Sequence, residues 1–176
     1  MSLILILGGA SSGKSEYAEG CLLALDREIR YYIATMKVHD AEDDKRVKRH
    51  IKLREGKDFI TIEKTKDIGA IELEDHKGVA ILEDMANLLA NEMFDDPSFI
   101  PDPERIADKI VSDIEGLLSK LDSLVIVSDN IFDSGTDYDQ YTISYMKAMG
   151  EINKKLSNIA DRVVEVVAGI PIVHKG

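Results

Sequence analysis

The chain has little of three things, and each shortage excludes a class of protein. Its 176 residues include one cysteine, Cys21, which excludes an internal disulfide and favours a reducing compartment. Basic residues number 22 against 33 acidic ones, and a net charge of −11 argues against nucleic acid as a general partner, because a phosphate polymer would be repelled. No apolar run approaches membrane-spanning length, and residues 1–9 lack the charged start of a signal peptide. We therefore expect no membrane span and a cytoplasmic location.

Hydrophobic residues make up 44% of the chain, enough for the core of one domain over residues 1–176. Short apolar runs alternate with helical periodicity. They predict strands at 3–7, 30–34, 59–62, 78–82, 124–127 and 163–167, an additional edge strand at 172–174, helices at 15–25, 104–121 and 142–160, and surface loops at 94–103 and 129–141. This alternation predicts a doubly wound, mostly parallel α/β sheet in three layers, with a ligand at the carboxyl edge of the strands.

The first predicted strand leads directly into a glycine-rich sequence with the pattern of a phosphate-binding loop, Gly8-Gly9-Ala10-Ser11-Ser12-Gly13-Lys14-Ser15. Glycines allow backbone N–H groups to converge on phosphate oxygens, and the following helix directs its positive dipole end toward them. Lys14 would reach the outer phosphates and Ser15 would ligate Mg²⁺. The alternative is a glycine-rich turn that fits by chance, which the strand before it and the helix after it disfavour. We therefore expect a P-loop NTPase-like (RecA-like) fold.

A second cluster gathers basic residues between positions 37 and 57 of this acidic protein. If residues 41–55 are helical, Arg46, His50 and Arg54 stack on one face at a spacing of four. Two neighbouring cations would keep the imidazole neutral and nucleophilic, and the guanidinium groups could hold a triphosphate or a departing pyrophosphate. Spacing alone favours a different interpretation, in which this is a solvated basic helix with an incidental histidine.

A third group of polar residues stands at predicted strand ends. Glu83 and Asp84 follow the apolar strand at 78–82, where phosphate-loop enzymes need a carboxylate near Mg²⁺. The alternative role for Asp84 is to cap the following helix, which leaves Glu83 as the metal-side residue. Asp129, after the strand at 124–127, is a weaker candidate.

Together these regions resemble one family, the bifunctional adenosylcobinamide kinase / adenosylcobinamide-phosphate guanylyltransferase of cobalamin synthesis. The resemblance is carried by residues 8–15 with Glu16 and Ala18, Tyr32-Ile33-Ala34-Thr35, Asp40, Glu42, Arg46, His50, Arg54, Thr61, Glu63, Ile81-Leu82-Glu83, Asn91, Gly150, Asn153, Ala160-Asp161 and Gly169-Ile170-Pro171.

Membership in this family would make His50 the nucleophile that accepts GMP from GTP, with release of pyrophosphate, before the nucleotidyl group passes to adenosylcobinamide phosphate. The second activity would phosphorylate the adenosylcobinamide hydroxyl from GTP or ATP. The resemblance also implies Mg²⁺, a corrinoid substrate and a homotrimer. The nucleotide would be bound by residues 8–15, Arg46, Arg54 and Glu83, with Lys14 and His50 catalytic and Ser15 and Glu83 at the metal.

The sequence departs from the family pattern between residues 129 and 147. Met146 and Lys147 stand where the family has an Arg-Asp pair, and Lys154 replaces a glutamine after Asn153. Two alternatives therefore stay open. One is a monofunctional small-molecule kinase with a different acceptor, and the other is a non-catalytic nucleotide-binding regulator.

Overall fold

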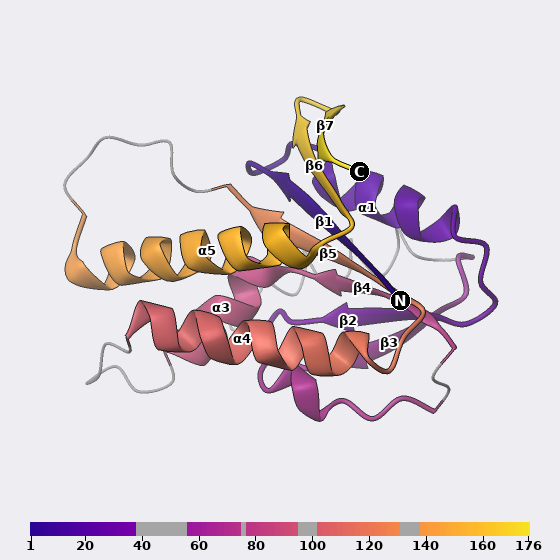
Figure 1. Ribbon diagram of the computed structural model, residues 1–176, viewed down its shortest axis with the longest axis horizontal. Coiled ribbons are helices and arrows are strands. Elements are labelled where there is room, and N and C mark those ends of the chain that lie inside the picture. Colours follow the sequence, from indigo (N-terminus) through magenta and orange to yellow (C-terminus); the bar gives the residue numbers. More distant parts are fainter. Residues whose placement is uncertain (38–55, 75–76, 95–101, 131–137) are drawn as a thin grey trace.

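The computed structural model describes residues 1–37, 56–74, 77–94, 102–130 and 138–176. These residues form a seven-stranded sheet in the order β3-β2-β4-β5-β1-β6-β7 (Figure 1). Neighbouring strands from β3 to β6 are parallel, and β7 alone runs antiparallel to its neighbour β6. The strands are β1 (Ser2–Gly8), β2 (Arg30–Ala34), β3 (Phe59–Glu63), β4 (Val79–Glu83), β5 (Ser123–Asp129), β6 (Arg162–Val167) and β7 (Ile170–Lys175).

Helices cover both faces of the sheet, and the prediction of a doubly wound, three-layered α/β fold is confirmed. One face carries α1 (Lys14–Leu23), and the other carries the 3₁₀ turn η1 (Ile68–Ala70), α3 (Met85–Met93), α4 (Pro103–Leu118) and α5 (Gln140–Ile159). Because β1, β2, β4 and β5 are parallel, the segments that follow them lie at one edge of the sheet. None of the helices in the described ranges is both long and apolar enough to cross a membrane.

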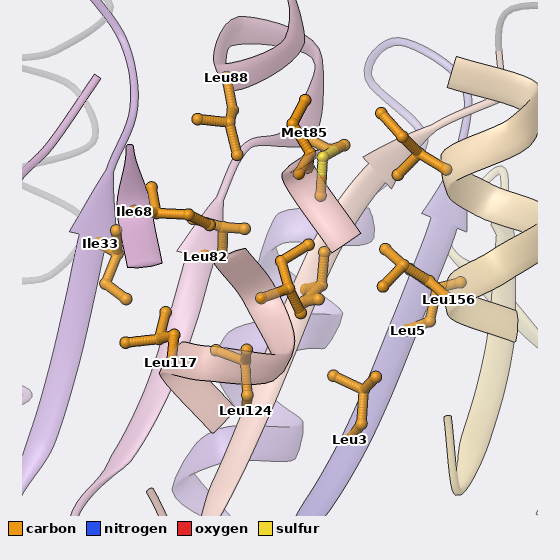
Figure 2. Close-up of a cluster of buried hydrophobic side chains, with 14 of the residues drawn as sticks. Leu3, Leu5, Ile33, Ile68, Leu82, Met85, Leu88, Leu117, Leu124 and Leu156 are labelled. Carbon is orange, nitrogen blue, oxygen red and sulfur yellow. The ribbon is translucent and has the colours of Figure 1, made fainter. Parts of the chain in front are cut away.

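The larger of the two cores lies between the sheet and α3, α4 and α5. Figure 2 shows Leu5, Leu82 and Leu124 of three neighbouring strands meeting Leu117 of α4 and Leu156 of α5. All five side chains are fully buried. Because each such burial stabilises the fold by about 1.5–3 kcal/mol, this layer fixes the strand ends that carry the polar residues.

The predicted helix and strand boundaries hold to within a few residues, with corrections at the two predicted loops. Asp102 accepts hydrogen bonds from Glu104 N and Arg105 N, so α4 begins at Pro103 inside the predicted loop at 94–103. The predicted loop at 129–141 is likewise shortened at both ends. Asp129 completes β5, and Asp139 caps α5, which starts at Gln140.

Two further observations concern α1 and the last strand. In α1, Cys21 is only half-buried, whereas Glu19 is buried and forms an ion pair with Lys57. The edge strand is longer than predicted and joins β6 through Ala168 and Gly169, both at positive φ. Two residues leave no room for a helical crossover, so the pairing is an antiparallel hairpin.

Gly78, the residue before β4, lies close to two side chains, and a substitution there tests this packing. A Cβ at this position would lie 2.7 Å from Tyr31 Cε2 and 3.0 Å from Ile29 Cγ2, and Tyr31 is buried. We expect Gly78→Ala to lower the free energy of unfolding by about 1–3 kcal/mol in urea titrations. Gly116→Ala is the matched control, because a Cβ in α4 meets nothing within 4 Å and should raise stability by up to about 1 kcal/mol. Equal effects of the two substitutions would contradict this packing.

Candidate nucleotide-binding site

The phosphate loop, residues 8–15, joins the end of β1 to the start of α1, as predicted. Gly13 has φ of +91°, which favours glycine, and Ser12 N donates to Gly9 O at 3.3 Å. A Cβ on Gly8 would lie 2.8 Å from the carbonyl oxygen of Val166. Glycine is therefore required at both positions, first for the close approach of β6 and then for the turn into the helix.

Lys14, the first residue of α1, points back over the loop. Its Nζ lies 2.7 Å from Asp129 Oδ1 and donates to Gly9 O at 3.2 Å. Asp129, a weaker metal candidate in the sequence, is thus the ion-pair partner of the loop lysine. A phosphate bound in the loop would meet a cation already held at its rim, which favours binding of an anion there.

Ser15 and Glu83 meet at the carboxyl edge of the sheet. Ser15 Oγ donates to Glu83 Oε1 at 2.6 Å, and Glu83 Oε2 is buried with no hydrogen-bond partner among the described residues. Burial raises the pKa of Glu83 to about 7, the hydrogen bond from Ser15 opposes the shift, and the charge of Asp84 adds to it. A hydroxyl beside a carboxylate with a free, buried oxygen is a donor set that fits Mg²⁺.

Asp84 has the capping role that the sequence left open. Its Oδ1 accepts from Asn87 N at 2.8 Å, at the start of α3. Thr35, which is fully buried after β2, donates through Oγ1 to Asp84 O at 2.7 Å and accepts from Asp84 N at 2.9 Å. Both sides of the Asp84 backbone are therefore held by Thr35, which fixes the neighbouring Glu83.

Two asparagine side chains form hydrogen bonds with segments around the site. Asn91 Nδ2 donates to Thr35 O at 2.8 Å and to Thr65 O at 3.1 Å, joining the segments after β2 and β3. Asn153 accepts from Ser128 Oγ at 2.6 Å and donates to Asp129 O at 3.1 Å. In the sequence, both asparagines stand out only as part of the family pattern. Their partners lie 24–56 residues away, so no local signal could have revealed these roles.

The turn between β6 and β7 lies against the phosphate loop. Gly169 N donates to Ser12 O at 2.8 Å, and Asn130 N, after β5, donates to Gly8 O at 3.1 Å. The phosphate loop is thus tied through the carbonyl groups of Gly8 and Ser12 to neighbours on both sides.

A separate acidic cluster does not form a cation site. The carboxylates of Asp67, Glu92 and Asp113 lie within 4.8 Å of one another, but Lys109 Nζ is bound by all three, at 2.6, 2.5 and 3.1 Å. This lysine supplies the positive charge, and the cluster ties η1, α3 and α4 together.

The predicted residues Arg46, His50 and Arg54 lie outside the described residues. The chain re-enters the described part at Gly56, and the ion pair of Lys57 with Glu19 places this point beside α1. The structure thus brings together Lys14, Ser15 and Glu83, and the histidine and its two arginines stay predictions.

The sequence of this chain is similar to those of known proteins. The sequence model of the family described as cobinamide kinase / cobinamide phosphate guanyltransferase matches residues 4–173. The chain is 29% identical to the bifunctional adenosylcobalamin biosynthesis protein CobP of Pseudomonas aeruginosa, over 98% of this chain and 96% of that protein. It is 27% identical to the bifunctional adenosylcobalamin biosynthesis protein CobU of Escherichia coli K12, over 98% and 99%.

Solved structures show the same fold at low sequence identity. The flagellar accessory protein FlaH of Methanocaldococcus jannaschii superposes with a TM-score of 0.52 at 15% identity, over 99% of this chain and 78% of FlaH. A prototypical ATPase from the type III secretion system of pathogenic bacteria gives 0.57 at 10% identity, over 93% of this chain and 51% of the ATPase. The predicted P-loop NTPase-like fold is confirmed.

The buried carboxylate of Glu83 predicts a pH-dependent stability. Its pKa of about 7 in the folded protein exceeds the usual 4.3 of an unfolded chain, so the folded state binds the proton more tightly. Stability should fall as the pH rises from about 4.5 to 7 and then level off. Glu83→Gln removes this titration. We therefore expect the free energy of unfolding of Glu83→Gln, minus that of the parent, to be about 1–3 kcal/mol higher at pH 8 than at pH 5. Urea unfolding of both proteins at the two pH values measures this, and a constant difference would contradict it.

Proposed function

This chain belongs to the cobinamide kinase / cobinamide phosphate guanyltransferase family, and on that premise we propose that one nucleotide site serves both reactions in the family's name. The chain is a nucleotide-dependent transferase of adenosylcobalamin biosynthesis. The observation that carries the proposal is the convergence of Lys14, Ser15 and Glu83 at one strand edge, with Ser15 Oγ 2.6 Å from Glu83 Oε1. The family match spans the divergent region at 129–147, which favours this function over a monofunctional kinase or a non-catalytic regulator.

In the kinase reaction, the hydroxyl oxygen of the cobinamide attacks the γ-phosphorus of the triphosphate, and the hydroxyl proton is lost to solvent. A new P–O bond forms as the bond to the β-phosphate oxygen breaks, and the nucleoside diphosphate leaves. Lys14 would neutralise charge on the outer phosphates, while the loop N–H groups hold them in line. Ser15 and Glu83 would hold Mg²⁺, which supplies Lewis-acid stabilisation of the phosphate oxygens when bound.

In the guanylyltransferase reaction, a ring nitrogen of His50 would attack the α-phosphorus of GTP. A P–N bond forms, the bond to the β-phosphate oxygen breaks, and pyrophosphate leaves. The phosphate oxygen of cobinamide phosphate then displaces the histidine. Arg46 and Arg54 would lower the proton affinity of the imidazole and bind the departing pyrophosphate. Support for these three roles comes from the family resemblance and from their spacing of four residues.

We also propose GTP as the guanylyl donor, GTP or ATP as the phosphoryl donor, and a corrinoid as the acceptor. The corrinoid is a small molecule, so the net charge of −11 poses no obstacle of the kind it would to nucleic acid. The trimeric assembly and the cytoplasmic location stay predictions from the sequence.

The covalent intermediate can be tested directly with GTP labelled at the α-phosphorus. We expect acid-labile, alkali-stable label on the protein and its loss in His50→Ala. His174→Ala is the matched control, because His174 is exposed on β7 and bonded to Glu165, and this variant should keep the label. Label that persists in His50→Ala, or an unlabelled parent protein, would contradict the proposal that His50 is the nucleophile.

The two reactions should separate when the nucleophile and the loop lysine are changed in turn. Lys14→Ala should lower the rates of cobinamide phosphorylation and of protein guanylylation by about 100-fold or more, since both need the outer phosphates neutralised. His50→Ala should abolish guanylyl transfer and keep the kinase rate within about threefold. Steady-state rates with cobinamide and with cobinamide phosphate report the two activities, and a kinase loss in His50→Ala equal to that in Lys14→Ala would contradict separate roles.

A further inference from the structure

Asp129 is the last residue of β5, the strand that lies between β1, which leads into the phosphate loop, and β4, which ends at Glu83. Asp129 is paired with Gly8, the first residue of the loop, while the last pair between β5 and β4 joins Ile126 to Leu82. Asp129 therefore lies two residues, or about 7 Å, farther toward the carboxyl edge of the sheet than Glu83 does. This position is on the solvent side of the edge where the outer phosphates would bind.

The side chain of Asp129 lies on the same face of the sheet as the phosphate loop and α1. Along β5, Val125 and Val127 pack in the smaller core together with residues of α1. Because side chains alternate between the two faces of a strand, Asp129 follows these two valines to the α1 side. The distance of 2.7 Å between Lys14 Nζ and Asp129 Oδ1 agrees with this placement.

The ion pair with Lys14 also sets how far the Asp129 carboxylate would be from a bound triphosphate. In the proposed function, on which this inference rests, Lys14 donates to the outer phosphates. One ammonium group can contact the carboxylate and a phosphate oxygen together, and two hydrogen bonds of about 2.8 Å would separate these oxygens by about 5 Å. A hydroxyl oxygen placed about 3–3.5 Å from the γ-phosphorus would then be within hydrogen-bond reach of Asp129.

Hydrogen bonds hold the backbone at Asp129 in place. Asn153 Nδ2 donates to Asp129 O at 3.1 Å, and the next residue, Asn130, donates through its backbone N to Gly8 O at 3.1 Å. The Asp129 side chain is 20% exposed, so a substrate atom can reach a carboxylate whose backbone is fixed.

The negative charge of Asp129 needs an explanation, because a carboxylate beside a phosphate site repels the ligand. A neutral side chain with an oxygen atom could also accept a hydrogen bond from Lys14. The two carboxylates at the end of β4 have different partners, since Glu83 accepts from Ser15 and Asp84 caps α3. A role that requires a carboxylate, and not only an oxygen, accounts for Asp129.

We infer that Asp129 is the base of the kinase reaction and accepts the proton of the acceptor hydroxyl. The O–H bond breaks as the hydroxyl oxygen forms its new bond to the γ-phosphorus, and the proton passes to the Asp129 carboxylate. The bond to the β-phosphate oxygen breaks and the nucleoside diphosphate leaves. Asp129 then releases its proton to solvent, which restores the carboxylate for the next turnover.

Asp129→Asn separates this role from that of holding Lys14. The amide keeps an oxygen that accepts from Lys14, but it cannot take up the proton. We expect kcat for cobinamide phosphorylation to fall by about 100-fold or more, the usual contribution of a general base. The KM for the nucleotide and the rate of protein guanylylation by GTP should stay within about threefold of the parent, because neither depends on the acceptor hydroxyl.

Two further variants serve as controls. Asp122→Asn is the matched control, because Asp122 directly precedes β5 at its opposite end and its carboxylate lies 3.2 Å from Arg27 Nε in an exposed ion pair. This variant should keep both rates within about twofold of the parent. Asp129→Ser also cannot act as the base and should give the same selective loss as Asp129→Asn. Calorimetry with a non-hydrolysable GTP analogue and Mg²⁺ checks that both Asp129 variants keep the phosphate site.

Three results would overturn the inference. One is cobinamide phosphorylation at the parent rate in Asp129→Asn. Another is an equal loss of phosphorylation and of guanylylation, which would mean that Asp129 acts only by holding Lys14. A parent protein that phosphorylates no cobinamide would contradict the proposed function, and the inference with it, before any variant is compared.

Discussion

Ser15 and Glu83 are 68 residues apart in the chain, and their 2.6 Å hydrogen bond is where the phosphate loop meets the end of β4. The contact spans β5, which lies between β1 and β4 in the sheet. Its geometry therefore depends on the register of three parallel strands, and that register depends on the buried layer beneath them. A slip of one residue in β4 would turn Glu83 to the opposite face and leave Ser15 without its carboxylate.

Polar groups near Glu83 hold the backbone of Asp84 by hydrogen bonds. They leave Oε2 of the Glu83 carboxylate without a hydrogen-bond partner among the described residues. Thr35 binds both sides of the Asp84 backbone, and Asn91 in turn holds Thr35 O. The unpartnered, buried Oε2 raises the cost of ionising Glu83, a cost that a bound cation would remove. Such an arrangement stabilises the protein less than a fully paired carboxylate would, and it fits a site built to receive a charged ligand.

Local patterns in the sequence were sufficient for the strands, for the phosphate loop and for the position of Glu83 at the end of β4, while its role at a metal stays a prediction. Each depends on residues adjacent in the chain, such as the apolar run of β4 followed by two carboxylates. The roles of Thr35, Asn91 and Asn153 were not predictable, because each depends on partners set by strand order. The same holds for Asp129, which pairs with Lys14 across 115 residues. The β6–β7 hairpin was missed as a pairing because a short apolar run does not show the direction of a strand.

Hydrogen bonds hold the phosphate loop on two sides, and the one on the β5 side comes from the region that departs from the family pattern. On the β5 side, Asn130 N binds Gly8 O, and on the β6 side, Gly169 N binds Ser12 O. The sequence departs from the family pattern after β5, yet the loop contacts there use backbone atoms and the Asp129 carboxylate. Backbone contacts tolerate side-chain changes. Met146 and Lys147 lie on α5 and line a cavity together with Pro103 and Glu104 of α4, so substitutions there leave the backbone contacts of the phosphate loop in place.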